Sequence, residues 1–126
     1  MKNILVTGCC GFIASHLSVR LCQLGHEVTG IDWMKGYEDR KKASLRILSG
    51  LDNFHFIEGD INQDLPGESF DFVFHLAAIP GVRGSIDSPV KTMISNVMGT
   101  TNVFDWSRNG GSRKIIYASS SSVYGL

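Results

Sequence analysis

The residues of this chain with the clearest chemical potential lie near its start, in Thr7-Gly8-Cys9-Cys10-Gly11-Phe12-Ile13-Ala14-Ser15. The apolar run Ile4-Leu5-Val6 precedes this stretch, and residues 12–24 follow it with apolar side chains at helical spacing. A strand, a glycine turn and a helix are therefore expected in that order. The spacing Gly8-x-x-Gly11-x-x-Ala14 suits a loop on which a pyrophosphate rests at the first turn of the helix. The stretch predicts a dinucleotide site.

Separate positions of this loop have separate roles. Gly8 is expected to make the tight turn, and Gly11 to let the backbone approach the pyrophosphate. Ala14 replaces the third glycine and must still allow the helix to pack closely on the strand. The first helical N–H groups, those of Phe12 and Ile13 included, supply donors and a partial positive charge for phosphates. A plain glycine-rich turn is the alternative interpretation.

An acidic residue, Asp32, lies 21 positions beyond Gly11, at the end of the second predicted strand. Its carboxylate can accept hydrogen bonds from both hydroxyls of an adenosine ribose and would repel a 2′-phosphate, which favours NAD over NADP. Tyr37-x-x-x-Lys41 has the spacing of a catalytic tyrosine–lysine pair, but it lies on the adenosine side, so we interpret it as a coincidence. Four nearby basic residues keep NADP as an alternative, although a solvated helix face is their simpler interpretation: Lys35, Arg40, Lys41 and Lys42.

Three later stretches each follow a predicted strand. In Gly59-Asp60-Ile61, Asp60 can hydrogen-bond the adenine amino group or simply form a turn. In His75-Leu76-Ala77-Ala78, the small residues leave room for a cofactor, and His75 is interpreted as a satisfied core histidine. The hydroxyls of residues 119–122 can hold a substrate oxygen beside the nicotinamide, or merely cap the end of a strand.

The elements that must position these residues alternate along the chain. Strands are expected at residues 2–7, 27–31, 54–58, 70–76 and 114–118. Helices are expected at 12–24, at 38–49 and from Pro89 to about Asn109, with Ser88 as the N-cap of the last, and residues 77–88 are expected to form a loop. This pattern predicts an α/β fold, a Rossmann-like doubly wound parallel sheet with strand order 3-2-1-4-5. Its ligand crevice would lie between the first and fourth strands.

The composition limits the remaining function classes. A chain of 126 residues with 43% hydrophobic and 19% charged residues is an ordinary globular chain of at most one domain. Twelve basic residues balance twelve acidic ones, which argues against nucleic-acid or membrane partners. No run is apolar enough to span a bilayer and no secretory leader is present, so a cytoplasmic protein is expected. Three cysteines, two of them adjacent, predict reduced thiols rather than a disulfide framework or a metal site.

Taken together, these motifs resemble the NAD-dependent epimerase/dehydratase family, the extended branch of the short-chain dehydrogenases/reductases. The resemblance covers all 126 residues. It depends on Thr7-Gly8-x-x-Gly11-Phe12-Ile13, Asp32, Gly59-Asp60-Ile61, His75-Leu76-Ala77-Ala78, Asn96-x-x-Gly99-Thr100-x-Asn102 and the serine run before Val123-Tyr124-Gly125. Within the family, Gly81-Val82-Arg83-x-Ser85 and the stretch 118–125 are most similar to UDP-glucuronate 4-epimerases.

The resemblance implies roles for particular residues. Ser120, three positions before Val123, would take part in catalysis, and Asn96 would help to hold cofactor or substrate. Arg83 would meet a carboxylate or phosphate of the sugar nucleotide, unless it is a solvated loop residue. Substrate contacts are also expected from Ser121 and Ser122, and cofactor contacts from the whole set Gly8, Gly11, Phe12, Ile13, Asp32, Asp60, Ile61, Leu76, Ala77, Ala78 and Asn96. The implied reaction is transient oxidation of a sugar at C4, with a tyrosine as base.

The family's catalytic Tyr-x-x-x-Lys helix and its substrate-binding part would lie beyond residue 126. The expected unit is therefore residues 1–126, an NAD-binding domain that is truncated before the base and inactive alone. Such a chain would leave apolar surface at the fifth strand uncovered, which favours association or a homo-oligomer. A sugar-nucleotide decarboxylase, a 4,6-dehydratase, a non-catalytic NAD-binding module and a flavin enzyme are the alternatives. The dehydratase is disfavoured because Ser121 and Ser122 stand where an acidic pair is usual.

Overall fold

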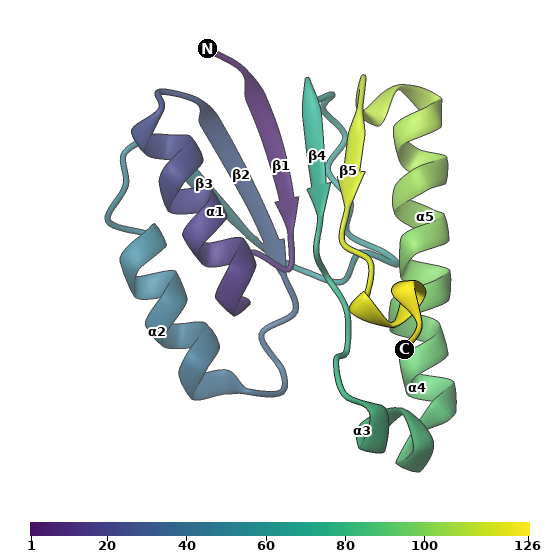
Figure 1. The fold of residues 1–126 in the computed structure, drawn as a ribbon. Coiled ribbons are helices and arrows are strands. Elements are labelled where there is room, and N and C mark those ends of the chain that lie inside the picture. Colours follow the sequence, from purple (N-terminus) through teal and green to yellow (C-terminus); the bar gives the residue numbers. More distant parts are fainter.

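The computed structural model describes residues 1–126 and contains one parallel sheet with helices on both faces (Figure 1). Its five strands are β1 (Asn3–Thr7), β2 (Glu27–Asp32), β3 (Phe54–Glu58), β4 (Phe72–His75) and β5 (Ile115–Tyr117). They lie in the order β3-β2-β1-β4-β5, and every pair is parallel. The predicted fold class and strand order are confirmed. The register pairs Thr7 with both Ile31 and His75, so the carboxyl ends of β1, β2 and β4 meet at one edge.

Alternate residues of β1 define two hydrophobic cores. Ile4 and Val6 face a core shared with α1 (Phe12–Gln23) and α2 (Glu38–Leu48). Leu5 faces the opposite core, which includes Val103 of α5 (Gly99–Trp106). A strand covered on both faces is apolar at every position, which explains the unbroken Ile4-Leu5-Val6 run. The three cysteines are buried and free, as small apolar residues would be.

The segment between β4 and β5 differs most from its prediction. Residues 77–88 were expected to form a loop, but they contain the short helix α3 (Val82–Asp87). Ser88 ends α3 and begins α4 (Pro89–Met93), and its carbonyl, not its hydroxyl, accepts from the Thr92 N–H and hydroxyl. Ser88 is the N-cap of α4, as predicted, although its hydroxyl makes no capping hydrogen bond. Pro89 does occupy the first helical turn, as predicted.

The helical segment continues from α4 through η1 (Ile94–Met98), α5 and η2 (Ser107–Gly111), as a single rod beside β5 in Figure 1. Gly110 has φ +104, the left-handed conformation that ends helices, close to the predicted end. The single turn η3 (Ser121–Tyr124) follows β5. None of these helices combines the length and apolarity that a membrane crossing requires. Large apolar side chains are nonetheless exposed along this side of the molecule, among them Val90, Val97, Tyr117 and Tyr124.

Candidate dinucleotide site

Gly8 makes the turn that joins β1 to α1. Its φ is +70, and its N–H donates to the Ile31 carbonyl at 2.8 Å. A Cβ at this position would lie 2.8 Å from the Cα atom of Ala77, closer than side chains are found to approach backbone. The left-handed backbone and the contact with Ala77 each require glycine. The turn thus brings the ends of β1, β2 and β4 within contact of one another.

The first turn of α1 has free donors. Gly11 is the N-cap, its N–H donates to the Gly8 carbonyl at 2.9 Å, and no side chain caps the helix. The N–H groups of Phe12, Ile13 and Ala14 have no acceptor in the structure. The Phe12 and Ile13 side chains are exposed, so they do not cover these donors with protein. Unsatisfied N–H groups with the positive end of a helix dipole are suited to an anion such as a pyrophosphate.

Asp32, at the end of β2, connects this loop to the rest of the site. One carboxylate oxygen, Oδ2, accepts from the Cys10 N–H at 2.9 Å, and the other, Oδ1, lies 2.9 Å from the Lys41 ammonium. Asp32 is only 7% exposed, which keeps its carboxylate in one orientation. The interpretation of Lys41 as a solvated helix residue is wrong, because its side chain is only 18% exposed and bonded to Asp32.

Three side chains bring atoms that could bind a metal ion within 4.8 Å of one another, namely those of Cys9, Cys10 and Asp32. The atoms are already engaged, since the two thiols contact each other at 3.9 Å and the Asp32 oxygens hold the Cys10 N–H and Lys41. The hydrogen bond with Cys10, together with burial, raises the pKa of the Cys9 thiol far above its ordinary value. Cys9 is therefore a protonated, unreactive core residue.

The end of β3 leads into a tight turn. Asp60 Oδ1 accepts from the Asn62 N–H at 2.9 Å, and the Asp60 N–H donates to Asp64 Oδ2 at 2.8 Å. Ile61 is buried beneath the helical rod, where a Cβ on Gly99 would lie 2.6 Å from its Cδ1 atom. The turn-forming interpretation of Asp60 thus has direct geometric support. The second Asp60 oxygen makes no hydrogen bond and is available for an adenine amino group.

A buried hydrogen-bond network supports the end of β4. The Thr7 hydroxyl accepts from the N–H groups of Leu76 and Ala77 at 3.2 and 3.1 Å. Its own proton therefore goes to His75 Nδ1 at 2.7 Å, so the His75 proton is on Nε2, which donates to the Thr100 hydroxyl at 2.8 Å. Burial lowers the pKa of His75. This geometry supports the interpretation of His75 as a satisfied core histidine in its neutral form.

Asn96 holds the loop that follows β4. Its side-chain carbonyl accepts from the Ile79 N–H at 2.7 Å, and its amide group donates to the Ile79 carbonyl at 2.9 Å. These two bonds fix the backbone of residue 79 in the manner of a strand partner. Asn96 thus positions this loop from its place in η1. The sequence predicted that Asn96 would hold cofactor or substrate, and it did not predict the contact with Ile79.

These features surround one cavity of about 1440 Å³ at the carboxyl ends of the strands. Most of the predicted cofactor residues line it: Gly8, Gly11, Phe12, Asp32, Asp60, Ile61, Leu76, Ala77 and Ala78. Ile13 and Asn96 do not line it. Sequence reasoning assigned no cofactor role to several further lining residues, among them His16, Trp33, Lys91 and Ile94. They have no motif of their own, and only the fold brings them to the cavity.

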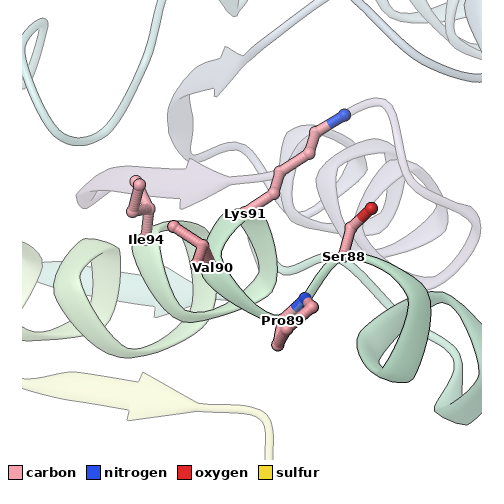
Figure 2. Close-up of a pocket in the computed structure, with 5 residues that line it drawn as sticks. All are labelled: Ser88, Pro89, Val90, Lys91 and Ile94. Atoms are coloured by element: carbon pink, nitrogen blue, oxygen red, sulfur yellow. The ribbon is translucent and has the colours of Figure 1, made fainter.

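A smaller hollow of about 500 Å³ lies at the start of α4 (Figure 2). Ser88, Pro89, Val90, Lys91 and Ile94 line it, and Lys91 and Ile94 also line the large cavity. Figure 2 shows Lys91 and Ser88 pointing to one side of the helix and Pro89 to the other. The hollow therefore adjoins the large cavity at Lys91 and Ile94.

The predicted catalytic residue Ser120 and the predicted substrate residues lie outside the large cavity. The Ser120 hydroxyl accepts from the Ser122 N–H at 3.1 Å and caps η3, which contains Ser121 and Ser122. Arg83 is exposed on α3. The serine run thus caps the helical turn η3, and not the end of β5 as the alternative interpretation had it. The hydroxyl proton of Ser120 makes no hydrogen bond in the structure and remains available as a donor.

The chain is similar in sequence to several known proteins. A model of the NAD dependent epimerase/dehydratase family matches residues 4–126. The chain is 38% identical to UDP-glucuronate 4-epimerase 1 of Arabidopsis thaliana and 36% identical to UDP-glucuronic acid decarboxylase 1 of Danio rerio, over 98% of its length in both cases. These matches cover 31% and 28% of the relatives. Two other curated relatives are covered to 41% and 39%, so the chain spans less than half of each.

Solved structures agree with these relatives. UDP-N-acetylglucosamine 4-epimerase from Methanobrevibacter ruminantium, in complex with UDP-N-acetylmuramic acid, superposes with a TM-score of 0.83 at 34% identity, covering 98% of this chain and 39% of that one. UDP-glucose-4-epimerase from Stenotrophomonas maltophila, with bound NAD and a UDP-arabinopyranose derivative, gives a TM-score of 0.83 at 30% identity, covering 99% and 39%. The chain therefore belongs to the NAD-dependent epimerase/dehydratase family, which confirms the predicted family and NAD as its cofactor.

Proposed function

We propose that this chain binds NAD in the cavity between Gly8, Asp32 and Ala77. The observation that carries the proposal is the glycine turn, where the N–H groups of Phe12, Ile13 and Ala14 have no acceptor and no side chain can enter at Gly8. These donors suit the pyrophosphate, and the buried Asp32 carboxylate suits the adenosine ribose hydroxyls. The residues present thus fit the dinucleotide that the family uses.

We further propose that the chain is the NAD-binding part of a longer nucleotide-sugar epimerase, which acts on UDP-glucuronate or a related UDP-sugar. When bound, NAD supplies a reversible hydride acceptor for C4 of the sugar. The Ser120 hydroxyl, whose oxygen already accepts the Ser122 N–H, would hold the reacting sugar oxygen by donating a hydrogen bond to it. The identity with a UDP-glucuronate 4-epimerase over 98% of the chain supports this substrate class.

Titration calorimetry tests the binding proposal. The 126-residue chain is expected to bind NAD⁺ weakly and to prefer it to NADP⁺, because the Asp32 carboxylate would repel a 2′-phosphate. Absence of binding would contradict the proposal.

No turnover of UDP-glucuronate is expected from the chain alone, because its single Tyr-x-x-x-Lys, at Tyr37 and Lys41, lies beside Asp32. Measurable turnover by purified chain would contradict this expectation. A longer protein carrying a Tyr-x-x-x-Lys about 25 residues past Gly125 would exclude a purely non-catalytic NAD-binding module.

A sugar-nucleotide decarboxylase is the second candidate. The 36% identity with a UDP-glucuronic acid decarboxylase, over the same 98% of the chain, specifically favours it. Both reactions begin with oxidation at C4, so the NAD site serves either. Incubating the longer protein with UDP-glucuronate distinguishes them, because a decarboxylase releases carbon dioxide and an epimerase leaves the substrate mass unchanged.

Two broader predictions accompany this proposal. The buried, free thiols are consistent with the cytoplasmic location expected from the sequence. Association through the apolar side chains exposed beside β5 stays a prediction.

A further inference from the structure

The Lys41 ammonium makes contacts that its neighbours on α2 do not. It lies 2.9 Å from Asp32 Oδ1 and also donates to the backbone carbonyls of Trp33 and Lys35. Lys42, the next residue, is exposed, and its ammonium makes no hydrogen bond or ion pair in the structure. Lys41 thus reaches from the first turn of α2 back to the end of β2 and holds the intervening loop.

The ion pair changes the electrostatics of the ribose site. The Asp32 and Lys41 side chains are only 6% and 18% exposed, so water screens their charges poorly from each other and from a ligand. Both residues line the cavity, as does Arg40. A dinucleotide with a free 2′-hydroxyl can donate to Asp32, whereas a 2′-phosphate meets the repulsion of Asp32 and the attraction of Lys41 at the same place.

We propose that Lys41 is a specificity-determining residue, which sets how strongly the site rejects a 2′-phosphate. While Asp32 is charged, it occupies the ammonium, and NAD is preferred. When a substitution removes the Asp32 carboxylate, Lys41 becomes free to pair with the 2′-phosphate, and NADP is preferred. The site therefore contains one group that favours NAD, Asp32, and one that can favour NADP, Lys41. A single substitution at Asp32 would reverse the preference. This inference rests on the proposed binding of NAD.

The ratio of NADP⁺ to NAD⁺ dissociation constants, measured by calorimetry on the 126-residue chain, tests this role. The ratio is insensitive to partial unfolding, since both ligands titrate the same folded molecules. Lys41→Met leaves Asp32 uncompensated and is expected to raise the ratio by about tenfold, whereas Lys41→Arg keeps the charge and the ratio. Lys42→Met, a matched change on the exposed side of α2, is expected to leave it unchanged.

Charge removal at Asp32 tests the group that favours NAD. Asp32→Asn is expected to lower the ratio by about a hundredfold and to invert the preference, because a repulsive charge is lost and an ammonium is freed. In the double variant Asp32→Asn/Lys41→Met, most of the gain in NADP⁺ affinity should disappear.

An unchanged ratio in Lys41→Met, or an equal gain in the single and double Asp32 variants, would overturn the role of Lys41 while leaving NAD binding intact. Absence of any dinucleotide binding by the unchanged chain would instead overturn the proposed function, and this inference with it.

Discussion

At the scale of single residues, the role of Gly8 could be predicted from the sequence, whereas the role of Lys41 could not. Gly8 was predicted because a glycine between a strand and a helix has a backbone reason to be there, and its φ of +70 agrees. The pairing of Lys41 with Asp32 was not predicted, because a lysine within a basic run gives no sign of which side chain folds inward. Only the path of the loop between β2 and α2 determines which lysine reaches Asp32.

Substitution of Gly8 is expected to abolish the site. Gly8→Ala puts a Cβ 2.8 Å from the Ala77 Cα and strains a left-handed backbone, so we expect NAD⁺ affinity to fall more than tenfold and stability by about 1–3 kcal/mol. Calorimetry and urea unfolding measure the two effects.

Gly25→Ala is the matched control, since Gly25 also has positive φ, +84, but a Cβ there meets nothing within 4 Å. It should lose about 1 kcal/mol of stability and keep its NAD⁺ affinity. Equal NAD⁺ affinity in the Gly8 and Gly25 variants would show that the close contact with Ala77 does not shape the site.

At the scale of elements, the sequence predicted every strand and the helices that cover the sheet, because apolar runs mark the strands and α1. The mostly polar α2 was marked only by Leu45 and Leu48. It did not predict α3, since Pro80, Gly81 and Gly84 break any pattern in residues 77–88. The position of this loop comes from a distant residue instead, Asn96, which bonds both backbone groups of Ile79. Long-range tertiary hydrogen bonds of this kind leave no local signal.

The network that joins β1, β4 and α5 predicts a pH dependence of stability. His75 is neutral between the Thr7 and Thr100 hydroxyls, and burial lowers its pKa below the ordinary 6.5. The unfolded chain therefore binds more protons than the folded chain just below pH 6.5, and the free energy of unfolding must fall as the pH decreases through that region. Above pH 6.5 the contribution of His75 is complete.

Urea unfolding of the chain and of His75→Gln, from pH 8 to about pH 5, measures this dependence. The two free-energy curves should converge as the pH falls, because the variant has no imidazole to protonate. His16→Gln, at an exposed histidine on α1, is the control and should keep the slope of the unchanged chain. Curves that stay parallel throughout would contradict the assignment of His75 as a neutral, buried acceptor.

At the scale of the whole molecule, the sheet order places the cavity where β1 separates two oppositely wound halves. The same topology leaves β5 at an edge of the sheet, beside the helical rod (Figure 1). Tyr117 and several apolar side chains of the rod are exposed there. The cavity is lined by residues at the ends of β1, β2, β3 and β4, whereas Ser120 and Arg83 lie outside it. This division could be predicted from the resemblance, but the contacts of Ser120 with a substrate could not.

The central claim, that a dinucleotide binds on the glycine turn, is tested most directly by amide chemical shifts of ¹⁵N-labelled chain during titration with NAD⁺. The account predicts saturable shifts concentrated at the N–H groups of residues 8–14, at Asp32 and at residues 76–78, and little change along the exposed face of the helical rod. Shifts that leave the Phe12, Ile13 and Ala14 amides unmoved, or no shifts at all, would contradict it.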